Sequence, residues 1–137
     1  MSTKIFVNLP VKDLAASKAF FTALGYRFDE NFTDHKAACL VLGDDSYVML
    51  LVEPFFSSFT TKAIADTATA TEAIFALGQD SRADVDRIGE AALAAGARPA
   101  KETEDRSPMY TRSFYDLDGH HWEVFHLGAP VDPDAQG

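Results

Sequence analysis

Several features are scarce or missing in this sequence, and each absence excludes a class of protein. The chain of 137 residues has a single cysteine, so it forms no internal disulfide, and we expect a reducing, cytoplasmic location. No apolar run approaches the ~18 residues of a membrane helix, and the first residues do not predict a secretory signal. The chain has only 12 basic residues against 21 acidic ones, which gives a net charge of −9. We therefore expect neither nucleic acid nor a membrane among the partners.

The common catalytic and nucleotide-binding motifs are also missing. The sequence has no P-loop, no G-x-G-x-x-G and no G-x-S-x-G. Its four histidines include no pair with helical metal-site spacing. His120 and His121 follow a turn, where histidines are usually exposed to solvent, and Cys39 lies in an apolar run typical of an inert buried thiol. We therefore expect no cofactor.

What the sequence does have is enough apolar material for one core. Apolar residues make up 47% of the chain, and eleven phenylalanines predict an aromatic core, an aromatic-lined cavity, or both. We predict a single domain over residues 1–128, followed by a flexible tail at 129–137 that is rich in proline and acid. The Phe-rich segment at residues 53–62 favours a short helix or lid over a strand, and residues 61–67 favour another helical turn.

The order of the predicted elements repeats along the chain. In each half an aspartate opens a helix, Asp13 or Asp84, and a glycine twelve residues later ends it, Gly25 or Gly96. The first module, about 1–67, has strands at 5–9, 26–32, 37–42 and 47–52 around a helix at 13–24. The second, about 68–128, has strands at 72–79, 97–102, 110–117 and 120–127 around a helix at 82–95, with an exposed loop at 103–109.

A module of this kind has one apolar sheet face and cannot close a core alone. The sequence therefore predicts an α+β protein in which two βαβββ modules form a curved eight-stranded mixed sheet around a cleft. The helices are expected on the outer face of that sheet.

Two segments carry a resemblance to known proteins. Residues 11–17 read VKDLAAS, followed by FF at 20–21 and LGY at 24–26, while residues 114–124 read FYDLDGHHWEV. These segments resemble the opening V-x-D-L-x-x-S and the closing F-x-D-P-D-G-x-x-W-E-L of the vicinal oxygen chelate superfamily. That superfamily includes glyoxalase I, the fosfomycin- and bleomycin-resistance proteins and the extradiol dioxygenases. It hosts many reactions, so the resemblance predicts a fold more sharply than a chemistry.

The resemblance also implies where metal ligands would stand. The metal enzymes of the superfamily use a His or Glu from each of four strands. Carried over to this chain, the first three positions fall at Phe6, at Met49 or Leu50, and near Ile74. Only the fourth, Glu123, keeps a ligand type. Because the other side chains offer no hard donor to a divalent cation, we predict that the family metal site is absent.

Two classes of function stay open. One is a protein that binds or sequesters a small, partly apolar molecule. The other is an enzyme of lyase, isomerase or dioxygenase type, either metal-free with Glu123 or Glu72 as base, or with a rearranged metal site. The resemblance implies a homodimer. The predicted ligand-binding residues are Phe6, Met49, Phe55, Phe56, Ile74, Arg112, Phe114 and Phe125. The alternatives to these functional roles are structural: Glu72 is simply exposed to solvent, and the phenylalanines pack in the core.

Arg112 and Glu123 are predicted to form a pair on one face of the sheet. If the last two strands join through a symmetric loop at residues 117–120, Phe114 lies opposite Glu123. Arg112 then lies opposite Phe125, diagonal to Glu123. Such a pair either orients a polar group of a ligand or neutralises a semi-buried carboxylate.

The substitutions at the ligand positions generate a prediction about metal content. Purified protein is expected to hold no stoichiometric divalent metal after dialysis, and to show no glyoxalase I activity with added Ni²⁺, Zn²⁺ or Mn²⁺. Elemental analysis checks this, and a value near one metal per chain would contradict it.

Overall fold

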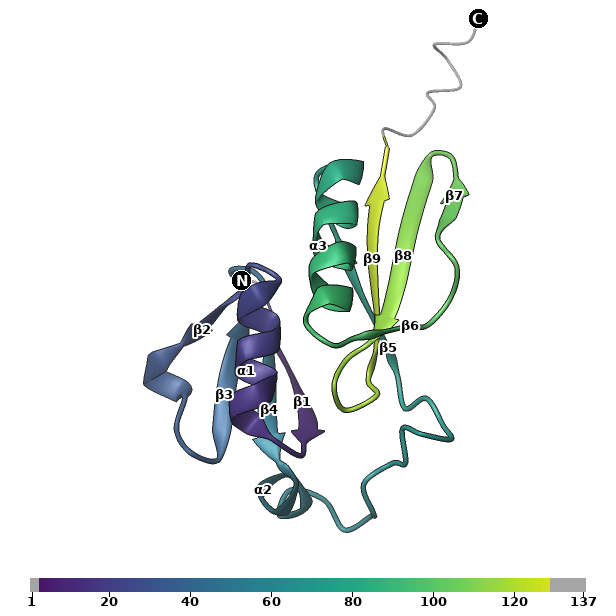
Figure 1. The fold of residues 1–137 in the computed structure, drawn as a ribbon. Helices are drawn as coiled ribbons and strands as arrows, with labels where there is room; N and C mark the ends of the chain where they lie inside the picture. Colours follow the sequence, from purple (N-terminus) through teal and green to yellow (C-terminus); the bar gives the residue numbers. More distant parts are fainter. Residues whose placement is uncertain (1–2, 129–137) are drawn as a thin grey trace, which may run out of the picture. The chain divides into compact units, whose positions relative to one another are not determined.

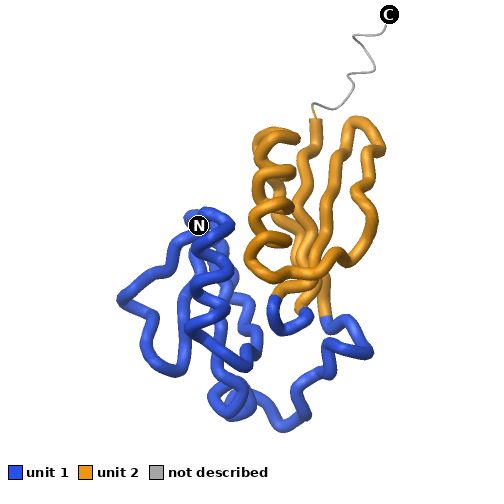
Figure 2. The backbone as a smooth tube through the Cα atoms, viewed as in Figure 1, with its two compact units in different colours: residues 1–72, 117–119 blue, residues 73–116, 120–137 orange. Residues whose placement is uncertain are grey.

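The computed structural model describes residues 3–128, so the predicted tail at 129–137 lies outside the described residues. The described chain forms two compact units (Figure 2). Unit 1 contains the residues up to Glu72 together with the short segment Leu117–Gly119, and unit 2 contains the rest. None of the described helices is long and apolar enough to cross a membrane.

Unit 1 is a four-stranded sheet with a helix packed on it (Figure 1). Its strand order is β1-β4-β3-β2, in which β1 pairs with β4 in parallel and the other neighbours are antiparallel. Its elements are β1 (Ile5–Val11), α1 (Leu14–Ala23), β2 (Arg27–Asp29), the 3₁₀ turn η1 (Glu30–Phe32), β3 (Ala37–Val41), β4 (Ser46–Val52) and the short helix α2 (Glu53–Ser57). The predicted strand–helix–strand–strand–strand order is confirmed for this half.

Helix α1 begins and ends as the sequence predicts. The Asp13 side chain accepts a hydrogen bond from the backbone N–H of Ala16 at 3.0 Å, which satisfies one of the free amides of the first turn. The helix ends just before Gly25. Its apolar positions, spaced at helical intervals, are buried: Leu14, Phe20 and Phe21.

Unit 2 repeats this plan with one extra strand. Its path of strands is β5-β9-β8-β6, in which β5 pairs with β9 in parallel, and α3 packs on β8 and β9. Its elements are β5 (Ile74–Gly78), α3 (Arg82–Ala94), β6 (Arg98–Pro99), β7 (Glu104–Arg106), β8 (Met109–Tyr115) and β9 (His121–Leu127). The additional strand β7 pairs with β8, although residues 103–109 were expected to be a loop.

The α+β class and the two βαβββ modules are thus confirmed, but some details differ. The strands form two sheets, of four and five strands, rather than a single sheet of eight. Residues 61–67 are not helical. The two main helices are unequal, with 10 and 13 residues, because Ser81 caps α3 by accepting from the N–H of Asp84. Asp84, predicted as the cap, lies in the first turn instead.

The turn between β8 and β9 fixes the register of these strands. Asp116 and His120 face each other across it, since the Asp116 N–H donates to the His120 carbonyl at 3.0 Å. The Asp116 carboxylate accepts from the His120 N–H at 3.0 Å and from Trp122 Nε1 at 2.8 Å. Three residues therefore form the loop, and Gly119 takes the left-handed conformation, with φ 82°, that such a loop requires.

The three loop residues Leu117–Gly119 belong to unit 1 through the contacts of Asp118. Its carboxylate accepts from the Lys12 N–H at 2.9 Å and from Ser17 Oγ at 3.3 Å, while its carbonyl accepts from Thr67 Oγ1. Lys12 and Ser17 come from the first of the two motifs that resemble the superfamily, and Asp118 comes from the second. Both motifs therefore have a structural role.

The Asp116 carboxylate should contribute strongly to stability. Replacing it with alanine removes the charged acceptor of the fully buried Trp122 N–H. We expect Asp116→Ala to lower the free energy of unfolding by about 2–3 kcal/mol in urea denaturation. Adding Trp122→Phe, which removes the donor as well, should cost less than the sum of the two single changes.

Asp105→Ala is the matched control, because Asp105 is an exposed carboxylate in a surface pair with Arg82. Its unfolding free energy should be almost that of the parent protein. Equal losses in Asp116→Ala and Asp105→Ala would contradict the role given to the buried hydrogen bonds.

Candidate functional site

One face of the unit 1 sheet carries predicted ligand-binding side chains. The parallel register of β1 and β4 places Phe6 beside Tyr47 and Asn8 beside Met49. The rings of Phe6 and Tyr47 stack with centroids 4.6 Å apart, and Phe6 stays 48% exposed. Because side chains alternate along a strand, Met49 shares this face, whereas Leu50 lies on the opposite face and is fully buried. Of the two positions that the resemblance left open, Met49 is therefore the one that lies on the same sheet face as Phe6.

A cavity of about 240 Å³ lies beside β1 in unit 1. It brings together Phe56 and Glu72, which the sequence predicted separately. It adds Asn8, which sequence reasoning missed even though it is the one polar residue of β1. The remaining lining side chains are small or apolar: Leu9, Pro10, Thr60, Ala63 and Ala65. The cavity is thus mostly apolar, with an amide and a carboxylate among its walls.

The Phe-rich segment forms a short helix rather than a strand, as predicted. The ring of Phe55 packs edge-on against Phe59 with centroids 5.0 Å apart, and Lys36 Nζ lies 4.6 Å from the Phe55 centroid. Phe55 is therefore engaged in aromatic and cation–π contacts. Phe56, one residue later, lines the cavity.

In unit 2, Glu123 lies on the sheet face opposite α3. Its neighbours across the strands are Ser113 on β8 and Ala76 on β5, so small side chains flank the half-buried carboxylate on both sides. Phe125 shares this face and lies over Gly78, where an added Cβ would come within 3.1 Å of Phe125 Cζ. Ile74, at the start of β5, is 53% exposed.

The two histidines after the turn are both buried, although one of them was expected to face the solvent. His121 is 7% exposed, and its Nε2 has no hydrogen-bond partner among the described residues. Its ring packs against Tyr115 with centroids 5.3 Å apart. The burial of His121 arises because β9 begins at this residue, which therefore lies inside the sheet rather than in the loop.

The predicted pair of Arg112 with Glu123 is wrong. The three-residue turn places Ser113, not Phe114, opposite Glu123, and Arg112 opposite Val124. A shift of one residue moves a side chain to the other face of a strand, so Arg112 and Glu123 lie on opposite faces. Phe114 lies opposite Trp122 and is buried in the core, so the prediction that it faces Glu123 is wrong as well.

Arg112 instead pairs with carboxylates of α3. Its Nη1 lies 3.0 Å from Glu90 Oε1 and 3.4 Å from Asp86 Oδ1. Asp86 also accepts a hydrogen bond from the Tyr110 hydroxyl, and this bond raises the pKa of Tyr110 above its usual value. Arg112 therefore forms its ion pairs with α3 rather than with Glu123, and the side chains of its partners Asp86 and Glu90 are exposed.

The side chains at the family's ligand positions do not fit a metal ion. Phe6 is stacked on an aromatic ring, and neither Met49 nor Ile74 offers a hard donor. Within residues 3–128, no three His, Cys, Asp or Glu side chains gather in a group that could hold a metal.

Comparison with known proteins agrees with this architecture. Residues 3–43 match the family model of the bleomycin resistance protein-like N-terminal domain. No curated protein matches the sequence significantly.

Several solved structures match over most of the chain. A hypothetical protein from S. aureus, SA1046, is 27% identical, with 93% of this chain and 95% of that chain covered and a TM-score of 0.79. A glyoxalase-related enzyme from Fulvimarina pelagi is 17% identical, with 98% and 95% covered and a TM-score of 0.79. The fosfomycin resistance protein FosX from Mesorhizobium loti is 16% identical, with 100% and 99% covered and a TM-score of 0.66.

The chain therefore has the vicinal oxygen chelate fold, and this fold together with the match of residues 3–43 confirms its resemblance to the glyoxalase and bleomycin-resistance proteins of that superfamily.

Proposed function

We propose that this protein binds a small, partly apolar molecule in the unit 1 cavity beside β1. The observation that carries the proposal is the lining of this cavity, in which five apolar side chains accompany Asn8, Thr60 and Glu72. Small-molecule sites are typically apolar hollows in which a few polar groups fix the orientation of the ligand. A volume of about 240 Å³ suits a ligand of roughly one ring.

The polar groups of the cavity indicate which part of a ligand they would hold. Asn8 Nδ2 donates to the backbone carbonyl of Phe6 at 3.3 Å, so its amide is held beside the cavity. The carboxylate of Glu72 is an acceptor, which suits a hydroxyl or amine of the ligand. Phe56 supplies an aromatic wall for the apolar part.

An enzymatic role is the second candidate, and one observation favours it. Glu72 lines the same cavity, so a carboxylate would touch the bound molecule and could act as a general base without a metal. The two candidates differ in the effect of Glu72→Gln. This change should leave substantial binding if Glu72 only orients the ligand, and should abolish turnover if it removes a proton.

Two exposed sheet edges support a homodimer. Strands β1 and β5 each lie at the end of the strand order in their own unit. They carry exposed apolar side chains, with Ile5 at 55% and Ile74 at 53% exposure. Apolar sheet edges of this kind are usually covered by another chain or by charged residues.

The proposed cavity can be tested with phenol as a small probe that combines an aromatic ring and a hydroxyl. Amide resonances of Asn8, Thr60 and Glu72 should shift saturably when phenol is titrated into ¹⁵N-labelled protein. Ala63→Leu, which adds carbon atoms inside the cavity, should weaken binding about tenfold. Ala68→Leu is the matched control, because Ala68 lies in the same connector and is exposed outside the cavity. Equal affinities of the two variants would refute the site.

The assembly can be tested independently of the ligand. Light scattering at micromolar concentration should give a mass of about 30 kDa, twice the 15.0 kDa of one chain. Replacing Ile5 with lysine should lower the dimer fraction, because a charge would then lie on the exposed edge strand. A mass of 15.0 kDa for the parent protein would count against the homodimer.

A further inference from the structure

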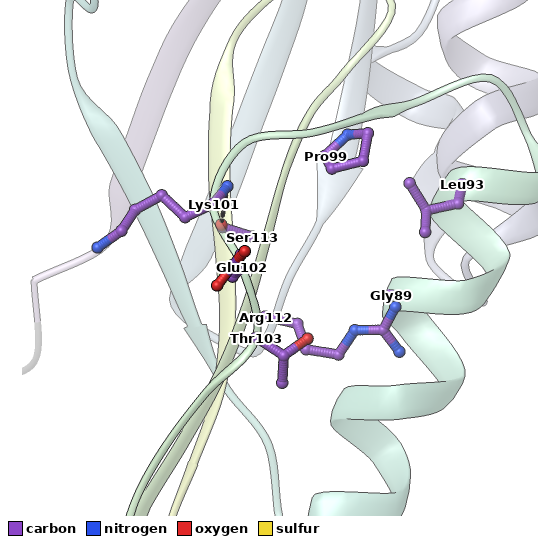
Figure 3. Close-up of a pocket in the computed structure, with 8 residues that line it drawn as sticks. All are labelled: Gly89, Leu93, Pro99, Lys101, Glu102, Thr103, Arg112 and Ser113. Carbon is purple, nitrogen blue, oxygen red and sulfur yellow. Dashed lines mark hydrogen bonds between the residues drawn. The ribbon is translucent and has the colours of Figure 1, made fainter.

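A second cavity lies wholly within unit 2, on the side of the sheet that carries α3 (Figure 3). Its volume is about 190 Å³. It arises beside β8, because β6 pairs only with residues 114 and 115 of that strand and β7 only with residues 109–111. The intervening segment, residues 100–103, forms no strand pair with β8. It stays attached to Ser113, because the Ala100 N–H donates to the Ser113 carbonyl at 3.4 Å and the Lys101 N–H donates to Ser113 Oγ at 3.0 Å.

The guanidinium of Arg112 forms one wall of this cavity. All of its bonds to described residues use Nη1, which contacts the carboxylates of Glu90 and Asp86 and the Asp86 carbonyl. Nε and Nη2 donate to none of the described residues, although the side chain is only 15% exposed. Nε and Nη2 lie along one edge of the guanidinium. In arginine–carboxylate pairs, such an edge donates two parallel hydrogen bonds to the two carboxylate oxygens.

Gly89 of α3 makes this position of the guanidinium possible. A Cβ at residue 89 would lie 2.8 Å from both Cζ and Nε of Arg112, so the guanidinium would have to shift to make room for it. Glycine inside a helix is unfavourable relative to alanine. Its occurrence here is explained by the space that the guanidinium needs.

The cavity has two chemically different sides. Figure 3 shows Leu93 and Pro99 on one side, and Arg112 with Thr103 on the other. The first side can contact hydrocarbon, and the second offers hydrogen-bond donors. Acidic groups lie close by, because Glu102 lines the cavity and Glu90 holds Nη1. A second negative charge on a ligand would be repelled, so the surroundings favour a monoanion over a dianion.

We propose that this cavity is a binding site for a small monocarboxylate with a short hydrocarbon chain. The carboxylate oxygens accept from Nε and Nη2 of Arg112, and the hydrocarbon lies between Leu93 and Pro99. This site is independent of the proposed cavity in unit 1, with which it shares no residue.

Titration of the ¹⁵N-labelled full-length protein tests the site, with butyrate as the probe. The amides of Gly89, Thr103 and Ser113 are expected to shift saturably, with millimolar affinity, because so small a molecule makes few contacts. Butyramide, which has the same shape without the charge, and inorganic phosphate, which is largely a dianion above neutral pH, should each bind about tenfold more weakly.

Arg112→Lys keeps the charge but removes the paired donors, and should weaken butyrate binding about tenfold. Arg106→Lys is the matched control, since Arg106 is highly exposed and lies outside the cavity, and should bind butyrate like the parent protein. If Arg112→Lys does not fold, the comparison of butyrate with butyramide on the parent protein still tests whether binding requires the carboxylate charge.

Three results would overturn the proposal. The first is equal binding of butyrate and butyramide, which would remove the role of the charge. The second is equal or tighter binding of phosphate, which would remove the preference for a monocarboxylate. The third is a butyrate-induced shift confined to Asn8, Thr60 and Glu72, which would place the ligand in unit 1 instead.

Discussion

The register of the β8–β9 hairpin decides the chemistry of both faces of the unit 2 sheet. It is set by the short turn in which Asp116 binds His120 and Trp122 and Gly119 takes a left-handed conformation. Because side chains alternate along a strand, this one choice places Glu123 on the open face. It places Arg112 and Phe114 under the helix, and with Arg112 it creates the polar wall of the unit 2 cavity.

The same turn shows where sequence reasoning succeeded and where it failed. Helix ends could be predicted from local signals such as Asp13 and Gly25, and strands from their apolar runs. The sequence Asp-Leu-Asp-Gly-His does not show whether the loop has three residues or four, because its turn-forming residues are compatible with both loop lengths. The error of one residue left β8 and β9 in place but reversed the face of every β8 side chain relative to β9, Arg112 included.

The candidate sites were predictable only in part for a related reason. Glu72 and Phe56 were selected from their chemistry, and the fold brings them to one cavity with Asn8. The cavity beside Arg112 depends instead on a gap between two short strands and on a missing Cβ at Gly89. Neither feature leaves a periodic pattern in the sequence. The superfamily motifs did not indicate the position of either cavity. Their residues Lys12, Ser17 and Asp118 form hydrogen bonds that hold the β8–β9 turn instead.

The contact between Gly89 and Arg112 also constrains the order in which this chain can change during evolution. A Cβ at position 89 would lie 2.8 Å from Cζ and Nε of Arg112, so the flexible arginine side chain would have to leave its present place. Once the arginine has been lost, a change of Gly89 to alanine becomes favourable, because alanine suits a helix better than glycine. After that second step, an arginine restored at position 112 would not find its former place against the helix. The effect on stability of a substitution at position 89 therefore depends on which residue occupies position 112.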